Sequence, residues 1–92
     1  MKVIKRYKNR KLYDTEDSRY VTLGEVFNYV RGGGNVQVVN NPTSEDITSV
    51  TLLSAIIEQS KTENFEPETL AAIIRGDNVP VAELVGQAQG RN

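Results

Sequence analysis

The chain has 92 residues, a mass of 10.2 kDa and 38% apolar residues, which is enough for one thin core and excludes a multidomain machine. The formal net charge is −1, and no stretch approaches the roughly 18 apolar residues that a membrane span needs. The N-terminus lacks the apolar region of a signal peptide, so we expect a cytoplasmic protein. Cysteine and histidine are absent, which argues against an enzyme, a metal site or a cofactor.

The first 22 residues are expected to form a small meander of short strands. Polar turn formers interrupt the apolar alternation at Asn9 and Arg10, and again over residues 14–18, where side chains can bond their own backbone. The strands expected on either side of these turns are Val3–Tyr7, Lys11–Asp14 and Arg19–Thr22.

A helix is expected to begin after Thr22. The hydroxyl of Thr22 and the carboxylate of Glu25 are spaced as a capping box, in which each side chain satisfies a free backbone N–H of the first turn. Three glycines at residues 32–34 should end the helix. The apolar stripe between these ends consists of Leu23, Val26, Phe27 and Val30.

The rest of the chain predicts two more strands and two more helices. β-branched residues indicate a strand at Val36–Asn40, and a turn then leads to a brief strand at Glu45–Thr48. Helical periodicity covers residues 49–60, and Pro67 and Gly76 bound a third helix. A last turn is possible over residues 81–85.

The expected architecture is α+β, with a small antiparallel sheet from the N-terminal half and about three helices, mostly C-terminal. Residues 1–85 are expected to form a single domain, followed by a flexible tail over residues 86–92.

Charge is distributed very unevenly along the chain. Residues 1–12 contain six bases and no acid, a local charge of +6, whereas residues 13–92 contain five bases and all twelve acids, a charge of −7. Bases concentrated in this way attract polyanions, and nearby tyrosine and asparagine side chains can donate to phosphates or base edges. The candidate DNA-binding residues are Lys5, Arg6, Tyr7, Lys8, Asn9, Arg10, Lys11 and Tyr13.

Strand alternation divides this basic segment between two faces. Lys5 and Tyr7 should lie on one face and Arg6 and Lys8 on the other, so the patch is split unless the turn brings residues 10 and 11 alongside. Two other interpretations remain open: the bases protect an exposed strand edge from aggregation, or they meet an acidic protein. Carboxylates that neutralised these bases would remove the case for a nucleic acid.

The other tyrosines and the acidic turn favour structural interpretations. Tyr20 is close to the apolar residues Val21 and Leu23 and is expected in the core, as tyrosines in such settings usually are. Tyr7 is therefore the better candidate for contact. The acids Asp14, Glu16 and Asp17 lack the later glutamate of a calcium loop, so a solvated turn is expected there.

The chain also resembles a known family. The motifs that carry the resemblance are residues 4–15, Ser18, residues 20–23, residues 45–48, Leu53 and residues 56–59. Over about residues 3–59, the chain resembles the N-terminal DNA-binding domain of bacterial polyhydroxyalkanoate (polyhydroxybutyrate) accumulation regulators.

This resemblance implies a cytoplasmic transcriptional regulator, usually a repressor, that binds DNA near genes for polymer synthesis. In such regulators the polymer or its granule surface competes with DNA. The chain departs from the family pattern at Asn40, where aspartate is usual, and at Ser44, where glycine is usual, so the turn there is expected to differ. Residues 60–92 match the family poorly, so DNA binding transfers better than polymer sensing.

We therefore expect a regulator that binds double-stranded DNA as a homodimer or higher oligomer, with two basic segments on a roughly palindromic site. Phosphates would be neutralised by the five bases from Lys5 to Lys11, and base edges read by Tyr7, Asn9 and Arg10. Readout by strands or an N-terminal arm is favoured, because the helices with clear apolar stripes lack a basic face. The alternative is a protein-interaction or oligomerisation module that uses the acidic side, around Glu58, Glu63, Glu66 and Glu68.

Overall fold

The structure, a computed structural model, describes residues 1–76. Its contacts divide the chain into two compact units, Met1–Thr62 and Glu63–Asn92. The turn expected over residues 81–85 and the expected tail over residues 86–92 lie outside the described residues.

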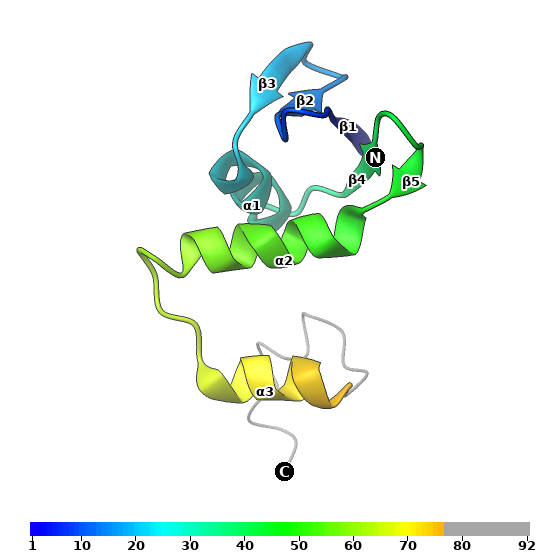
Figure 1. Cartoon of the computed structure of the whole chain (residues 1–92). Coiled ribbons are helices and arrows are strands. Elements are labelled where there is room, and N and C mark those ends of the chain that lie inside the picture. Colours follow the sequence, from blue (N-terminus) through cyan, green and yellow to red (C-terminus); the bar gives the residue numbers. More distant parts are fainter. Residues whose placement is uncertain (77–92) are drawn as a thin grey trace. The chain divides into compact units, whose positions relative to one another are not determined.

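The first unit is built on a five-stranded sheet with the strand order β3-β2-β1-β4-β5 (Figure 1). β1 is the central strand and pairs antiparallel with β2 and parallel with β4, while β2–β3 and β4–β5 are antiparallel pairs. The strands are β1 (Lys2–Arg6), β2 (Leu12–Asp14), β3 (Arg19–Val21), β4 (Val36–Asn40) and β5 (Glu45–Asp46).

Two parts of the expected fold class need correction. The sheet is mixed and not purely antiparallel, because β4 runs parallel to the central strand. The helices are not mostly C-terminal, since α1 (Leu23–Arg31) lies in the N-terminal half, ahead of α2 (Thr48–Gln59) and α3 (Pro67–Arg75). Both corrections have one cause: parallel strands need a long crossover connection, and the chain returns to β1 only after α1.

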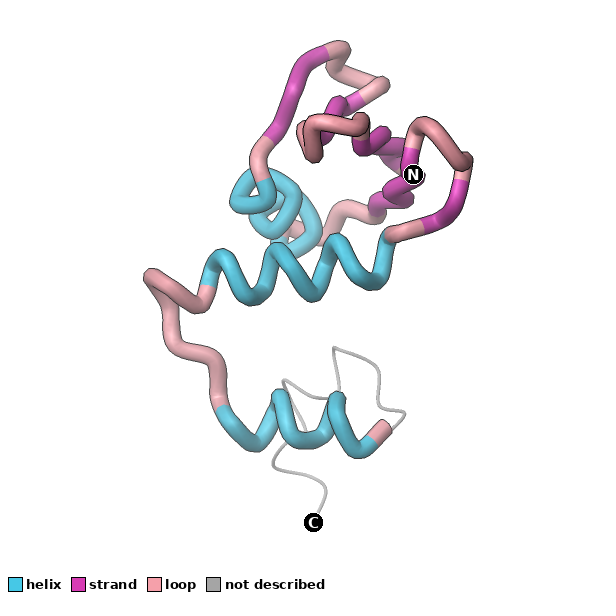
Figure 2. Tube along the Cα trace, viewed as in Figure 1, coloured by secondary structure: helices cyan, strands magenta, loops and turns pink. Residues whose placement is uncertain are grey.

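The core of the first unit lies between the sheet and its two helices. Ile4, Leu12 and Val38 are buried side chains of three adjacent strands, and they cluster with Val26 of α1. Helix α2 contributes Ala55, which is 2% exposed, and contacts both α1 and β4. The strands lie on one side of this helix pair, so the sheet has one covered face and one face free of these helices (Figure 2).

The ends of α1 follow the sequence prediction. Glu25 N–H donates to Thr22 Oγ1 at 3.1 Å and Thr22 N–H donates to Glu25 Oε1 at 2.9 Å, which completes the capping box. The Thr22 N–H and then the Arg19 guanidinium lower the pKa of Glu25. After the helix, Gly34 lies against the Tyr29 ring. A Cβ at this position would come within 2.3 Å of that ring, so the close approach requires glycine.

Candidate nucleic-acid interface

The basic segment folds into a tight hairpin between β1 and β2. Arg10 N–H donates to Tyr7 O at 2.8 Å and Tyr7 N–H donates to Lys11 O at 3.0 Å, which closes the loop. Lys11 N–H also donates to the side-chain oxygen of Asn9 at 3.0 Å. The basic hairpin, residues 5–11, therefore has an ordered tip formed by Lys8, Asn9 and Arg10, all exposed.

The strand register decides which face of the sheet each hairpin residue occupies. Lys5 lies opposite Tyr13, and Tyr13 lies opposite Tyr20, so these side chains share one face. Tyr7 and Lys11 are on the same face by alternation along their strands. Arg6 lies opposite the buried Leu12 and therefore belongs to the helix-covered side, as the alternation predicts.

We call the helix-free side of β1, β2 and β3 the open face. It carries Lys5, Tyr7, Lys11, Tyr13 and Tyr20. The turn thus brings Lys11 beside Tyr7, which places two bases on this face and three tyrosines between and beside them.

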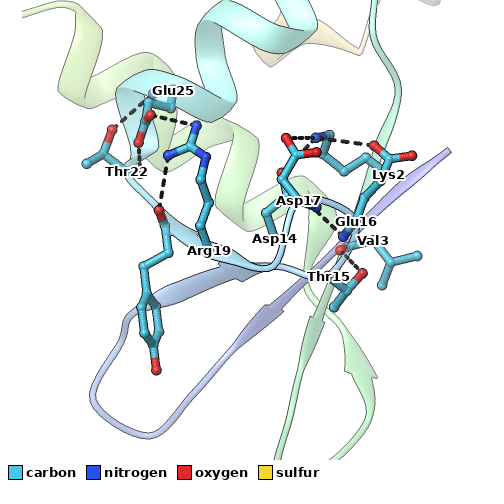
Figure 3. A network of polar contacts seen from close by, with 10 residues as sticks. Lys2, Val3, Asp14, Thr15, Glu16, Asp17, Arg19, Thr22 and Glu25 are labelled. Atoms are coloured by element: carbon cyan, nitrogen blue, oxygen red, sulfur yellow. Dashed lines mark hydrogen bonds and ion pairs between the residues drawn. The ribbon is translucent and has the colours of Figure 1, made fainter.

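One base of the N-terminal segment is used structurally. The ammonium of Lys2 lies 2.6 Å from Asp14 Oδ2 and 3.3 Å from both Glu16 Oε1 and Asp17 Oδ2 (Figure 3). The same ammonium lies 4.8 Å from the centroid of the Tyr29 ring. We call this group the Lys2 cluster, and its contacts remove Lys2 from the charge available to a ligand.

The Lys2 cluster shifts the pKa values of its two most buried members. The hydrogen bond to Asp14 raises the pKa of Lys2 above its ordinary 10.5, although burial lowers it. Burial raises the pKa of Asp14, but hydrogen bonds from Lys2 and from the backbone N–H groups of Asp17 and Glu16 outweigh it, so the net shift is downward. Both groups are therefore held in their charged forms.

Sequence reasoning missed this cluster. The acidic turn was expected to be solvated, yet Asp14 is 2% exposed and accepts backbone hydrogen bonds from Glu16 and Asp17. A signal was present in the alternation: Asp14 is two residues from buried Leu12, and Lys2 is two residues from buried Ile4, so each belongs to the core side. A buried charge without a partner is costly, so this alternation could have predicted an ion pair between Lys2 and Asp14 on the core side.

The remaining bases of the segment keep their charge available. Within residues 1–76, no salt bridge to a carboxylate involves Lys5, Arg6, Lys8, Arg10 or Lys11. The Lys11 ammonium lies over the Tyr20 ring, 5.6 Å from its centroid, and this contact leaves its charge uncompensated.

The expectation that Tyr20 is a core residue is wrong. Tyr20 is 55% exposed, because it lies on the open face of an edge strand and not on the core side with Val21. Its ring packs edge-on against Tyr13, with centroids 5.2 Å apart.

A second turn lies beside the basic hairpin. Because β1 and β4 are parallel, they end at the same edge of the sheet, and Asn41 N–H donates to Arg6 O at 2.8 Å. Asn41 and Pro42 join three residues of the hairpin, Tyr7, Lys8 and Asn9, around a shallow hollow of about 370 Å³. The hairpin tip therefore does not project alone into solvent.

The β4–β5 turn contains both departures from the family pattern. Ser44 has φ of +62°, a left-handed conformation that favours glycine. Asn40 donates from its amide to Thr43 Oγ1 at 3.0 Å, so it supports the same turn. The serine thus occupies a backbone shape that glycine adopts more easily.

A comparison with protein families gives a match over most of the chain. Residues 3–63 match the family described as the PHB/PHA accumulation regulator DNA-binding domain. The chain belongs to this family. The matched range contains the basic hairpin, the open face and both helices of the first unit.

Relatives from two bacteria are similar to the chain. A protein of Thiocystis violacea named "Uncharacterized protein in phbA 5'region" is 42% identical over 76 residues, which is 80% of this chain and 55% of the relative. An uncharacterized protein of Allochromatium vinosum is 41% identical over 76 residues, 80% of this chain and 50% of that relative. The chain therefore spans about half the length of these relatives. No solved structure matches it significantly.

Two observations bear on other kinds of site. No helix within residues 1–76 combines the length and apolar character needed to cross a bilayer. In the same residues, no group of three or more histidine, cysteine, aspartate or glutamate side chains is arranged so that it could hold a metal ion.

Proposed function

We propose that the chain is the DNA-contacting part of a transcriptional regulator and that the basic hairpin is its contact with double-stranded DNA. The observation that carries this proposal is five bases in seven residues without a carboxylate partner in the described chain, within a family of DNA-binding domains. Protection of an exposed edge is less well supported, because β1 and β2 both have neighbours on each side.

The hairpin suits the major groove of duplex DNA, which admits a two-stranded β-ribbon. In this proposal Lys5, Arg6, Lys8, Arg10 and Lys11 neutralise phosphates, and Tyr7, Asn9, Arg10 and Tyr13 supply contacts to base edges or the backbone. The side-chain oxygen of Asn9 already accepts from Lys11 N–H, so its amide NH2 is the group that remains for DNA. A two-bond contact from Asn9 to adenine would require the same oxygen to accept a second hydrogen bond, which makes Arg10 the better candidate for reading a base.

The salt dependence of duplex binding tests this proposal. Affinity for promoter DNA should fall with salt with a log–log slope of roughly −0.9 for each phosphate contact. Replacing both Arg10 and Lys11 with alanine should reduce the slope by about two contacts, because two bases leave the hairpin. The measurement is fluorescence anisotropy of a labelled duplex across a salt series.

The matched control removes two bases outside the hairpin. Lys61→Ala with Arg75→Ala changes the net charge equally and should leave the slope close to that of the wild type. An equal reduction of the salt slope in both double variants would mean that duplex binding depends only on the total charge of the chain. No binding of promoter DNA by the wild type at low salt would reject the proposal.

We also propose that the functional form is a homodimer or a higher oligomer. The buried core is small, and α2 keeps Val50, Leu53 and Ile57 at 52%, 52% and 65% exposure. Two copies would bury such side chains and present two hairpins to a palindromic site. Sedimentation velocity tests this, and a monomer at all concentrations would contradict it. Association of copies without any duplex binding would instead favour the interaction module.

Repression and a response to polymer belong to the same proposal. By resemblance, the regulator would act in the cytoplasm as a repressor, and polyhydroxyalkanoate or its granule surface would compete with DNA. Amorphous polymer particles added to the preformed complex should then release the labelled duplex. The chain spans about half the length of its relatives, so the same release is measured in parallel with one of those relatives.

A further inference from the structure

The open face carries a row of three aromatic rings that extends beyond the proposed duplex contact to Tyr20. Tyr7 and Tyr13 have ring centroids 6.3 Å apart, and Tyr13 and Tyr20 have centroids 5.2 Å apart. The interplanar angles are 73° and 75°, so the middle ring meets both neighbours edge-on. The row crosses the sheet from the end of β1 to the edge strand β3.

Positive charge lies beside this row. Lys5 lies opposite Tyr13 in the sheet, and the Lys11 ammonium lies over the Tyr20 ring. Among the strand residues of the described chain, Asp46 supplies the carboxylate on this side of the sheet. It lies on β5, the edge strand opposite β3, and accepts hydrogen bonds from Gln37 and Thr48. The aromatic half of the face is therefore cationic.

Packing alone does not account for this arrangement. Cross-strand aromatic pairs do stabilise short strands, and the Tyr13 ring, partly covered by its neighbours, serves that purpose. Tyr20 remains 55% exposed at the edge of the sheet, where a smaller β-branched residue would suit the strand equally well. An uncharged polyester would gain much less from the two lysines than a polyanion would, because a charge-assisted hydrogen bond to an anion is the stronger contact.

We propose that the open face binds single-stranded nucleic acid, with unpaired bases stacking on Tyr20 and Tyr7 and with Lys5 and Lys11 contacting the phosphates. Aromatic rings on a positively charged sheet surface are the chemistry by which proteins hold unpaired bases without strong sequence preference. A base that stacks on Tyr20 displaces the Lys11 ammonium from the ring toward the strand's phosphate. The ligand is a sugar–phosphate strand with free bases, either DNA or RNA, and this site goes beyond the proposed duplex contact.

Intrinsic tyrosine fluorescence gives a direct test on the wild-type chain. The sequence contains four tyrosines and no tryptophan, so the emission comes from tyrosines, three of which form the row. Titration with oligo(dT) or oligo(U) should quench this emission as bases stack, and the stronger quencher identifies DNA or RNA as the preferred strand. Binding of oligo(dT) and oligo(U) without any quenching of the tyrosine emission would overturn the stacking proposal.

Two variants of Tyr20 separate stacking from strand stability. Tyr20→Val removes the ring and should weaken oligonucleotide binding by about tenfold, whereas Tyr20→Phe keeps the ring and should bind as the wild type does. Thermal melts followed by circular dichroism establish that both variants fold. Equal affinity of the two folded variants would overturn the proposal, and the wild-type quenching result decides it if Tyr20→Val does not fold.

Affinity for duplex DNA distinguishes the open-face site from the hairpin contact. Tyr20→Val should leave affinity for promoter duplex within about twofold of the wild type, because Tyr20 is outside the hairpin. Equal weakening of duplex and single-strand binding would mean that the open face belongs to the duplex site, and a separate site would be rejected. Failure of duplex binding with intact oligonucleotide binding would reject the hairpin proposal alone.

Discussion

Two residues in the turns at one edge of the sheet adopt a backbone shape that favours glycine. Arg10 has φ of +67° and Ser44 has φ of +62°. For residues other than glycine this left-handed conformation costs about 1–2 kcal/mol. A long cationic side chain at such a position is costly for folding, and duplex binding gives a reason for its presence at the hairpin tip.

Glycine at either position should therefore stabilise the fold. Relief of backbone strain exceeds the added freedom of the unfolded chain, so we expect Arg10→Gly and Ser44→Gly each to raise the free energy of unfolding by up to about 1 kcal/mol. Urea denaturation measures this change. Arg10→Gly should also make the negative salt slope of duplex binding shallower by roughly 0.9, because one base is lost.

Ser44→Gly is the matched control for this prediction, because it relieves the same strain without changing charge. It should stabilise the chain and leave the salt slope unchanged. A destabilised Arg10→Gly would mean that the arginine side chain contributes to the fold and is not retained for a ligand.

At the level of individual side chains, the sequence predicted the charge but not its division. The local charge of +6 counts Lys2 with the five candidate bases from Lys5 to Lys11, yet Lys2 is held by three carboxylates while those five are not. Apolar neighbours suggested a buried Tyr20, but alternation places it on the open face, opposite Tyr13. Which face a strand buries depends on its partners, and a local pattern does not contain that information.

At the level of elements, local signals predicted existence and ends well. The capping box at Thr22, the glycines after Arg31 and the β-branched run at Val36–Asn40 each determine one boundary through short-range chemistry. Helix α2 begins one residue earlier than expected, at Thr48. Its N-cap residue, Ile47, makes no side-chain capping bond, although Asp46 Oδ1 accepts from Thr48 N–H. Without a capping side chain at the N-cap position, periodicity alone locates a helix start only approximately.

The pairing of the elements could not be predicted in the same way. Consecutive strands joined by tight turns pair as antiparallel neighbours, and this rule accounts for β1, β2 and β3. The parallel pairing of β1 with β4 joins residues about thirty positions apart, from Lys2 with Val36 to Arg6 with Asn40. This pairing also places the two polar turns at the same edge, so the site near the hairpin tip depends on a contact that local patterns do not encode.

At the scale of the whole first unit, the Lys2 cluster joins distant parts of the chain. It ties the start of the central strand to the turn between β2 and β3, and Tyr29 of α1 covers the same ammonium. The hydroxyl of Thr15 donates to Val3 O at 2.6 Å and extends this connection. The acids of the turn thus satisfy one base within the fold and leave the basic hairpin, at the other end of β1, free for a polyanion.

The Lys2 cluster should make stability depend on pH in a definite direction. The pKa of Asp14 lies below its ordinary 3.8, so near and below that value the unfolded chain takes up a proton that the folded chain resists. Stability is therefore full above about pH 4 and falls as pH drops through the folded pKa. The pKa of Lys2 is raised above 10.5, so its contribution persists through neutral pH and is lost only at strongly alkaline pH.

Asp14→Asn should lower the urea midpoint at pH 7 and flatten the acid limb of the profile, because the variant lacks the proton-linked group and leaves the Lys2 ammonium with its two weaker partners. Urea midpoints measured from pH 2 to pH 7 test both effects, the acid limb being where the carboxyl titrates. Glu58→Gln is the matched control, since it removes one carboxylate from an exposed pair with Lys61 and should change neither the midpoint nor the limb appreciably. An unchanged acid limb in Asp14→Asn would show that other carboxyls govern acid unfolding, and that the link from β1 to the β2–β3 turn does not depend on this charge.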